Sequence, residues 1–346
     1  SNPDELKSVI RKELIETQET YGDERRTEIV EFYSDLTDED LIPEEDLIVT
    51  LSKEGYAKTQ PLDAYQAQNR GGTGKRAASL KDEDFVSKLF LANTHDTLLC
   101  FSSYGKVYWI KVYRLPRGGR NAKGRPIVNL LPLEKDERIQ AVLPVKEFND
   151  DQFIFMATES GSVKKTKLSA YSRPMKSGIK AIKLREGDRV VNAEITDGSK
   201  EIMLFSNSGK SIRFKETDAR PMGRVSQGVR GMRIEKDQRI ISLVVLEEGN
   251  ILVATENGFG KQTLKDEFSI QKRGGKGVIA IQTSKRNGNL IGANQVRTGD
   301  EVMFISTTGN LIRTRTDDIS VIGRNTQGVR LIRLSEDDNL LGMEKV

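Results

Sequence analysis

The sequence has almost no cysteine or histidine, two of the residue types from which many metal and catalytic sites are built. It contains one cysteine, Cys100, and one histidine, His95, in 346 residues. A single cysteine excludes a disulfide within the chain, and without a cluster of cysteine and histidine there is no ligand set for zinc. We predict that Cys100, in an apolar run, is a buried and inert thiol. His95 is predicted to be a turn residue with a local hydrogen bond, because a neighbouring aspartate alone does not make a catalytic pair.

Aromatic residues and long apolar runs are also scarce. Aromatics make up 6% of the chain, with Trp109 the single tryptophan, which argues against a scaffold whose face binds protein partners through aromatic hot spots. No run approaches the roughly 18 apolar residues of a membrane span. The N-terminus is acidic and helical in pattern, so no signal peptide is expected. These features favour a cytoplasmic protein with no membrane partner.

The net charge of +4 conceals an asymmetry. Residues 1–46 carry 16 acidic and 5 basic side chains, a net charge of −11, whereas the remaining 300 residues carry 50 basic and 35 acidic, a net of +15. A body with this excess of positive charge attracts polyanions, and nucleic acid is the first candidate.

The same boundary divides the predicted structure. Residues 1–46 are predicted to be a helical, acidic linker in which Leu6, Val9, Ile10 and Leu14 recur at helical spacing and Tyr21-Gly22 ends the helix. Residues 47–346 consist of short apolar runs broken by glycine, which indicates an all-β domain.

A repeat of about 50 residues organises the second part. A strand followed by a small-residue turn and a glycine occurs six times, in Leu47–Gly55, Thr97–Gly105, Gln152–Gly161, Glu201–Gly209, Asn250–Gly258 and Glu301–Gly309. A second glycine follows each of these after 17 or 19 residues, at Gly74, Gly124, Gly178, Gly228, Gly277 and Gly328. Each unit is predicted to form four strands, which is typical of the blades of a propeller-like disc.

Cations recur at fixed positions of this repeat. Four and six residues after the first glycine lie the pairs Lys165 and Lys167, Arg213 and Lys215, and Arg313 and Arg315. Because strand side chains alternate between faces, both members of a pair are expected on one face. Two residues after the second glycine lie Arg76, Lys180, Arg230 and Arg330, and Lys183, Arg233 and Arg333 follow three residues later. An offset of three requires at least one of these sets to lie at a strand end or bulge.

The repetition predicts a continuous basic track around the rim of the disc. Duplex DNA, with one negative charge per about 1.7 Å of axis, is the ligand that matches such a track. No element that reads bases is evident, so the track is expected to hold phosphates and to tolerate sequence.

Three stretches of the chain resemble the C-terminal domains of DNA gyrase A subunits. They are residues 21–29 (YGDERRTEI), 125–131 (RPIVNLL) and 323–329 (GRNTQGV), and the resemblance extends over essentially the whole chain. It implies a six-bladed β-pinwheel whose basic rim wraps duplex DNA with fixed chirality, so that ATP-driven strand passage by the holoenzyme introduces negative supercoils. It further implies that this domain is not itself an enzyme and needs no cofactor. Cleavage, ATP and magnesium belong to other parts of an A2B2 assembly with the B subunit, and the isolated domain is expected to be monomeric.

The resemblance also identifies a glycine-rich box that binds DNA. The positional match in the first repeat consists of Gln68, Arg70, Gly71, Gly72 and Gly74, followed by Lys75 and Arg76, with neutral residues at both variable basic positions. A complete match occurs in the fifth repeat, at Gln271, Lys272, Arg273, Gly274, Gly275, Lys276 and Gly277. Glycines in such a loop let backbone amides and arginine approach phosphates closely.

Other interpretations remain at this point. The A-type subunit of topoisomerase IV, whose related domain bends DNA without full wrapping, is the nearest. A propeller scaffold for protein partners is less well supported, because aromatic patches are not evident. A propeller hydrolase is less well supported too, because neither clustered carboxylates nor a phosphate-binding loop between strand and helix is evident.

Overall fold

The chain consists of two compact units, residues 1–42 and 43–346. The computed structural model describes residues 2–23, 27, 38–52, 55–62, 86–119, 122–308, 311–335 and 338–345. The first unit contains helix α1 (Pro3–Tyr21) and the 3₁₀ helix η1 (Asp38–Leu41). The Asn2 side chain caps α1 by accepting the Asp4 N–H, and the Gly22 N–H donates to the Gln18 carbonyl at its other end. The predicted helix and its stop at Tyr21-Gly22 are therefore confirmed.

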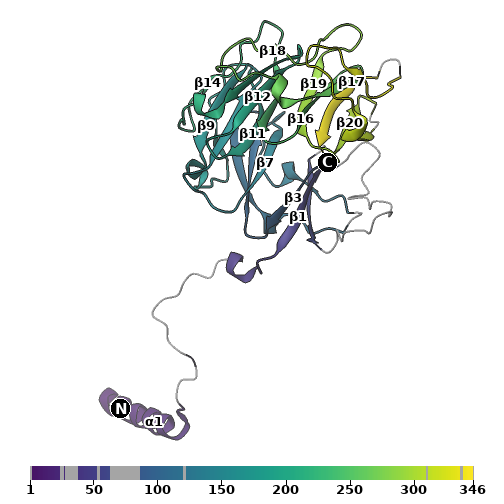
Figure 1. The fold of residues 1–346 in the computed structure, drawn as a ribbon. Helices are drawn as coiled ribbons and strands as arrows, with labels where there is room; N and C mark the ends of the chain where they lie inside the picture. The colour runs from purple at the N-terminus through teal and green to yellow at the C-terminus, as the bar shows by residue number, and fades with distance from the viewer. Residues whose placement is uncertain are drawn as a thin grey trace. The chain divides into compact units, whose positions relative to one another are not determined.

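The second unit is a six-bladed β-propeller of antiparallel sheets (Figure 1). The first sheet contains β1 (Asp46–Ser52), β2 (Tyr56–Pro61), β3 (Val86–Asn93) and β6 (Arg125–Pro126). The second contains β4 (Thr97–Ser102), β5 (Lys106–Lys111), β7 (Ile139–Val145) and β10 (Ile179–Lys180). The third contains β8 (Phe153–Thr158), β9 (Ser162–Lys167), β11 (Val190–Thr196) and β14 (Val229–Arg230).

The remaining sheets follow the same plan. The fourth contains β12 (Glu201–Ser206), β13 (Lys210–Lys215), β15 (Ile240–Leu246) and β18 (Val278–Ile279). The fifth contains β16 (Asn250–Thr255), β17 (Phe259–Thr263), β19 (Leu290–Val296) and β22 (Val329–Arg330). In the part of the chain that the structure describes, the sixth has three strands, β20 (Glu301–Ser306), β21 (Leu311–Arg315) and β23 (Leu340–Lys345).

The outer strand of each four-stranded sheet belongs to a later repeat. In the fourth sheet the order is β15-β12-β13-β18, and β18 lies in the fifth repeat. The prediction of four strands per unit is confirmed for repeats two to six, but the third strand of each has only two residues and joins the preceding sheet. This exchange of a strand ties successive repeats together.

The long strands that follow the outer strands line the middle of the unit. These strands, β7, β11, β15, β19 and β23, contact one another in succession. The opposite edge of each sheet, formed by a two-residue strand, is therefore the rim.

The core lies between successive sheets, so both faces of a blade are covered. Along β12, Ile202 and Leu204 pack with Phe155 of the third sheet, whereas Met203 and Phe205 pack with residues of the fifth. Alternate side chains of the strand thus pack against the two neighbouring sheets, and neither face of the strand is exposed to solvent.

At most of the described repeat glycines, a side chain would collide with the chain segment that crosses the hairpin. Gly209 ends the β12–β13 turn with φ +78°, and a Cβ there would lie 2.2 Å from the Ile281 carbonyl oxygen of the next repeat. Gly228, one of the second glycines, has φ +81°, and its Cβ would lie 2.4 Å from the Val163 carbonyl oxygen. Any larger residue would clash at both places, which is why glycine recurs with this spacing.

Candidate nucleic-acid interface

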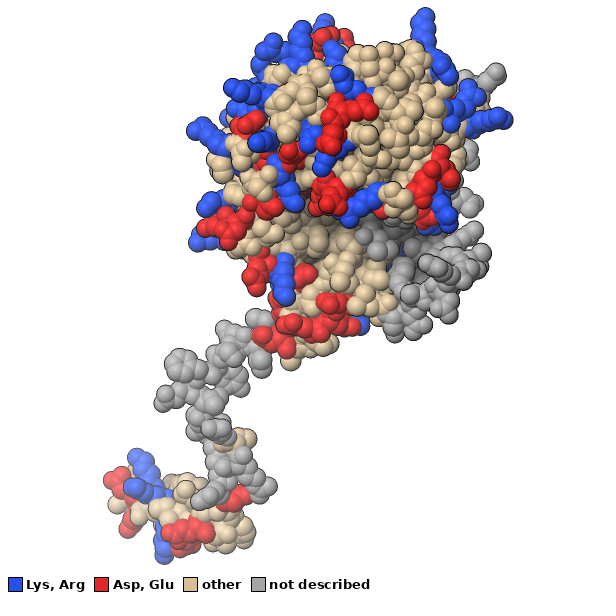
Figure 2. Space-filling model, in the orientation of Figure 1, with Lys and Arg blue, Asp and Glu red and all other residues tan. Residues whose placement is uncertain are grey.

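Three outer strands end on an exposed cation. Lys180 ends β10, Arg230 ends β14 and Arg330 ends β22. Because each of these strands is the outermost of its sheet, the three side chains lie at the same place on different blades of the rim. Figure 2 shows lysine and arginine side chains projecting along the edge of the second unit over β14 and β18. The structure thus places these three residues at the exposed outer edge of their sheets.

The second set of cations lies just beyond the outer strands. Lys183, Arg233 and Arg333 are exposed, and each follows its two-residue strand by three positions. The Lys183 N–H donates to the Ser226 carbonyl (3.1 Å) and the Arg233 N–H to the Gly275 carbonyl (2.8 Å), so the loop of the next repeat holds their backbone. Both sets therefore face solvent, because the strand ends between them.

The prediction of paired cations on one exposed face is wrong for Lys165 and Arg213. Their exposed fractions are 4% and 8%. The Lys165 ammonium donates to the Glu216 carbonyl (3.3 Å). Arg213 donates from Nη1 to the carbonyls of Lys265 and Phe268 (both 2.9 Å) and from Nε to the Glu201 carboxylate (2.8 Å). Neither side chain is accessible to a DNA phosphate.

These two cations belong to a set of donors that join neighbouring blades. The residue four positions after the first glycine donates to a carbonyl in or just after the 3₁₀ turn of the next repeat. This holds in five blades, for Thr59, Trp109, Lys165, Arg213 and Gln262. The 3₁₀ turns that lie after the second strands are η3 (Val112–Arg114), η5 (Leu168–Tyr171), η6 (Glu216–Asp218), η7 (Lys265–Glu267) and η8 (Thr316–Asp318). We call these five donors the seam donors; what they share is a donor, not a charge.

The second cation of each pair is exposed, in contrast to Lys165 and Arg213. Lys167, Lys215 and Arg315, six residues after the first glycine, end their strands and are exposed. Lys167 lies 3.5 Å from the Asp150 carboxylate. Arg313, the sixth-repeat equivalent of the seam donors, is 56% exposed in its side chain and pairs with Glu301.

The box of the fifth repeat is a turn between η7 and β18. Lys272 and Lys276 are exposed, whereas Arg273 is half-buried and donates to the carbonyls of Asp218 (2.8 Å) and Arg230 (3.0 Å). Arg324 makes the equivalent bond to the Ile279 carbonyl (3.1 Å) one repeat later. The arginine of this loop thus fastens it to the preceding repeat.

The rest of the loop presents its lysines. The Gly274 N–H donates to the Gly231 carbonyl (2.6 Å) with φ +81° at Gly274, and Gln271 donates its N–H to the Arg213 carbonyl (2.7 Å). Gly275 and Gly277 continue the turn into β18. The equivalent residues of the first repeat, Gln68, Arg70, Gly71, Gly72, Gly74, Lys75 and Arg76, lie outside the described residues.

Three buried lysines were missed by sequence reasoning. Lys58, Lys164 and Lys261 lie three residues after the first glycine in alternate repeats, and each is at most 2% exposed. Lys58 donates to the carbonyls of Gly119 and Ala122, Lys164 to those of Ala181 and Arg224, and Lys261 to those of Gly323 and Arg324. Each therefore holds a rim loop of a later repeat, and the recurrence of lysine in alternate repeats was the available signal.

Burial lowers the pKa of Lys164 to about 7, with a further contribution from the Arg224 charge. Because the unfolded chain then binds more protons above pH 7, the free energy of unfolding should rise with pH until the ordinary lysine pKa is reached. We expect the advantage of the unmodified chain over Lys164→Met to grow by about 3 kcal/mol between pH 6 and pH 9. Urea unfolding of both proteins at the two pH values measures this difference; a difference that is constant or shrinks contradicts it.

The remaining chemically notable residues have structural roles. Cys100 is fully buried, as predicted, and burial raises its pKa to about 12. The His95 N–H donates to the Asn93 side-chain oxygen (3.1 Å), which confirms the predicted turn. Within the described ranges, no three His, Cys, Asp or Glu side chains gather so as to hold a metal ion, and no helix is long and apolar enough to cross a membrane.

The fold and the rim together define a repeat-built, six-bladed β-propeller of the pinwheel type with cations on its outer strands. A family model described as the DNA gyrase C-terminal domain, β-propeller, matches residues 46–93, 96–146, 152–197, 200–247, 249–297 and 300–346. The chain belongs to this family. The six matched segments coincide with the six glycine-marked repeats, so the resemblance to gyrase A subunits is confirmed.

Individual relatives agree with the family. The DNA gyrase A protein of Salmonella typhimurium is 53% identical over 344 residues, covering 99% of this chain, and that of Escherichia coli K12 is 52% identical over 94% of it. The chain spans only 39% and 37% of the length of these two relatives.

Two solved structures share the fold. The C-terminal domain of a DNA topoisomerase IV has a TM-score of 0.78 and 28% identity, covering 88% of this chain and 94% of that one. A DNA gyrase A C-terminal domain has a TM-score of 0.68 and 28% identity, covering 87% and 99%.

Proposed function

We propose that this chain binds duplex DNA along its rim and wraps it with fixed chirality, as the C-terminal domain of a gyrase A protein. The observation that carries the proposal is the placement of Lys180, Arg230 and Arg330 at the exposed ends of outer strands. Cations at equal positions of the repeats match the evenly spaced phosphates of a duplex.

Bending a duplex around the rim costs free energy that the contacts must exceed. The elastic cost is of order 1–6 kcal/mol for a bend of 40–90° over 20–30 base pairs. The exposed second set, Lys183, Arg233 and Arg333, and the strand-end cations Lys167, Lys215 and Arg315 supply further contacts. Lys272 and Lys276 of the fifth-repeat box add two more at the rim.

The role in the whole protein follows from the family. We infer that the chain carries no catalysis or cofactor of its own. ATP, magnesium and DNA cleavage belong to the rest of an A2B2 assembly in the cytoplasm, in which the wrap directs ATP-dependent strand passage towards negative supercoiling. The first-repeat box around Arg70 stays part of this proposal.

A second candidate function is DNA bending without a full wrap, as in topoisomerase IV. The TM-score of 0.78 to a topoisomerase IV domain favours it, whereas the 53% identity to a gyrase A protein favours wrapping. Both candidates require DNA on the rim, and they differ in the path that the rim imposes on it.

The salt dependence of duplex binding tests the rim directly. We expect the logarithm of the association constant to fall with the logarithm of salt concentration with a slope of about −9 if roughly ten phosphates are contacted. Fluorescence anisotropy of a labelled duplex over a series of potassium concentrations gives this slope. Absence of binding, or binding that salt does not weaken, would contradict a cationic DNA track.

A further inference from the structure

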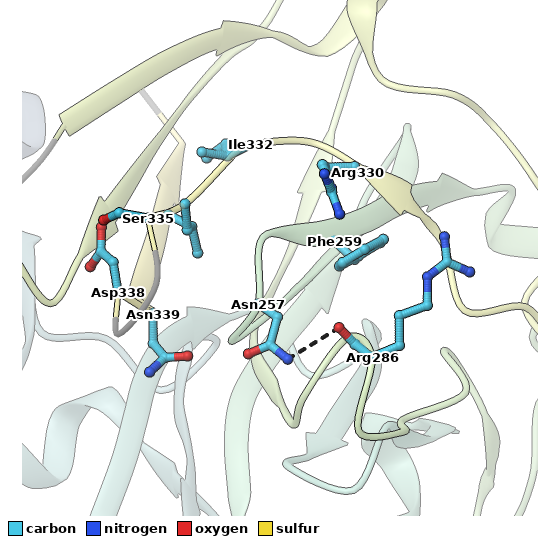
Figure 3. Close-up of a pocket in the computed structure, with 9 residues that line it drawn as sticks. Asn257, Phe259, Arg286, Arg330, Ile332, Ser335, Asp338 and Asn339 are labelled. Carbon is cyan, nitrogen blue, oxygen red and sulfur yellow. Dashed lines mark hydrogen bonds between the residues drawn. The ribbon is translucent and has the colours of Figure 1, made fainter.

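A cavity of about 460 Å³ opens where the hairpin of the fifth sheet meets the segment that follows β22. Its lining includes Phe259, Arg286 and Arg330 on one side and Ser335, Asp338 and Asn339 on the other (Figure 3). Arg330 is one of the three rim cations, so the cavity is continuous with the candidate interface.

Two arginine side chains of the cavity contact the same aromatic ring. Phe259 is the first residue of β17 and pairs with Arg330 of β22 across the sheet. The guanidinium carbons of Arg286 and Arg330 lie 4.9 Å and 5.3 Å from the centre of the Phe259 ring, and the ring lies between the two side chains in Figure 3. Phe259 is 3% exposed, because the two arginines and the sheet cover it. Stacking of this kind orients a guanidinium without using its N–H groups.

Among the described residues, the guanidinium N–H groups of both arginines have no partner: neither guanidinium donates a hydrogen bond or pairs with a carboxylate. Asp338, the acid among the described lining residues, accepts from Thr307 Oγ1 (2.7 Å) and from the N–H and Oγ1 of Thr308 (3.2 and 3.0 Å). Its oxygens are thus engaged by threonines.

The loop that carries Arg286 differs in charge from its equivalents. In each of the other five repeats, the equivalent loop of five residues begins six to nine positions after the second glycine and contains at least two acidic residues. These loops are residues 80–84, 133–137, 184–188, 234–238 and 334–338. In the fifth repeat the loop reads TSKRN, residues 283–287, with two cations and no acid. This change from acidic to basic residues occurs in the fifth repeat, which also contains Phe259.

The basic loop is also fixed in place. Asn287 is fully buried, its side-chain oxygen accepts the Ser284 N–H (2.8 Å), and its amide donates to the Gln327 carbonyl (3.1 Å). The Asn257 amide donates to the Arg286 carbonyl (3.1 Å), the bond drawn in Figure 3. The backbone of the loop that carries Arg286 is therefore fixed by hydrogen bonds before a ligand binds, as is typical of a preorganised anion site.

We propose that Arg286 and Arg330 form a phosphate-binding site that anchors one backbone phosphate of the bound duplex, with Phe259 as its positioning residue. The proposal rests on the proposed function, because it names one particular contact on the DNA rim. Two guanidinium groups supply planar, charged donors suited to phosphate oxygens. The site is local to the seam between the fifth and sixth repeats, so it fixes where on the rim the duplex is held most firmly.

Another repeat provides a matched control. Arg230 occupies the position of Arg330 but pairs across the sheet with Ser162 instead of an aromatic residue. The first repeat provides a conservative replacement, since Tyr56 stands at the position of Phe259 and its ring carries the Lys123 ammonium at 3.9 Å.

The test measures duplex affinity and its salt slope for variants of the chain. We expect Arg286→Gln with Arg330→Gln to weaken binding about 20-fold and Arg230→Gln to weaken it about 3-fold. Each of these changes should reduce the slope by about one, because the two arginines share one phosphate. Phe259→Leu should weaken binding about 5-fold in the native chain and not at all in the double-arginine variant. Phe259→Tyr should restore native affinity. Thermal unfolding of each variant reports whether it is folded.

Three results would overturn the proposal. One is a Phe259→Leu effect of equal size in both backgrounds, which would make the ring merely structural. Another is a double-arginine variant that binds no more weakly than Arg230→Gln. The third is loss of inorganic pyrophosphate binding by the double variant with duplex binding unchanged, which would assign the site to a free phosphate. Failure of the native chain to bind duplex would instead contradict the proposed function, so the two can be told apart.

Discussion

Replacing Lys180, Arg230 and Arg330 together by glutamine is expected to weaken duplex binding about 100-fold near 0.1 M salt. Each exposed charged contact contributes about 1 kcal/mol, and three contacts removed at once correspond to roughly two orders of magnitude. The salt slope should become less steep by about three, since each phosphate contact contributes about 0.9. Anisotropy titrations at several salt concentrations measure both quantities on the same samples.

A triple variant of equal charge change provides the control. Lys200, Arg297 and Lys345 border a cavity that the middle strand β15 and its neighbours line, away from the outer strands. Changing these three to glutamine lowers the net charge by the same amount, so it should weaken binding only a few-fold through the general field of the molecule. Equal losses for the two triple variants would show that net charge, and not the rim, determines affinity.

Arg213→Met is expected to destabilise the fold by about 3 kcal/mol and to leave the DNA affinity of the folded chain within about twofold. The substitution leaves the carbonyls of Lys265 and Phe268 without their donor and the Glu201 carboxylate without its partner. Removing one member of a buried ion pair typically costs 3–5 kcal/mol, and the lower end applies because Glu201 is partly exposed. Urea unfolding gives the stability, and titration below the transition gives the affinity.

The sixth repeat supplies the matched comparison for this prediction. Arg313 stands at the same repeat position and pairs with Glu301 as Arg213 pairs with Glu201, but its side chain is 56% exposed. Arg313→Met should therefore cost less than about 1 kcal/mol. If Arg213→Met weakened DNA binding as much as the rim variants while the fold kept its stability, the assignment of Arg213 to the seam between blades would be wrong.

The sequence was sufficient to predict the repeat, the hairpins and the rim cations. The glycines carry this information because the chain geometry at Gly209 and Gly228 tolerates no other residue. The cations of the outer strands were predictable for a similar reason, since a strand of two residues at the rim leaves its last side chain in solvent.

The seam donors could not be assigned from alternation alone. The rule that strand residues two apart share a face is correct, but the inference that this face is exposed assumes a sheet with one open side. In the described residues, both faces of the second to fifth sheets are covered by neighbouring sheets. A lysine or arginine at this position reaches carbonyls about fifty residues later, which a local pattern does not encode. The available signal was chemical, because Thr59, Trp109, Lys165, Arg213, Gln262 and Arg313 all carry a side-chain donor.

The arginine anchor at Phe259 required the structure for a different reason. Phe259 and Arg330 are 71 residues apart in the sequence and meet only because β22 joins the fifth sheet. The reversed charge of residues 283–287 was visible in the sequence, but its meaning depends on which hairpin the loop covers.

The linking number of a circular DNA relaxed in the presence of the chain tests the wrapping claim most directly. The chain is bound to relaxed plasmid, a type I topoisomerase relaxes the complex again, and the protein is removed before the topoisomers are separated. Wrapping of fixed hand predicts a shift of the distribution in one direction that grows with the amount of chain and is lost in the Lys180, Arg230 and Arg330 triple variant. Tight, salt-sensitive binding with no shift would contradict chiral wrapping and leave simple bending as the function of the rim.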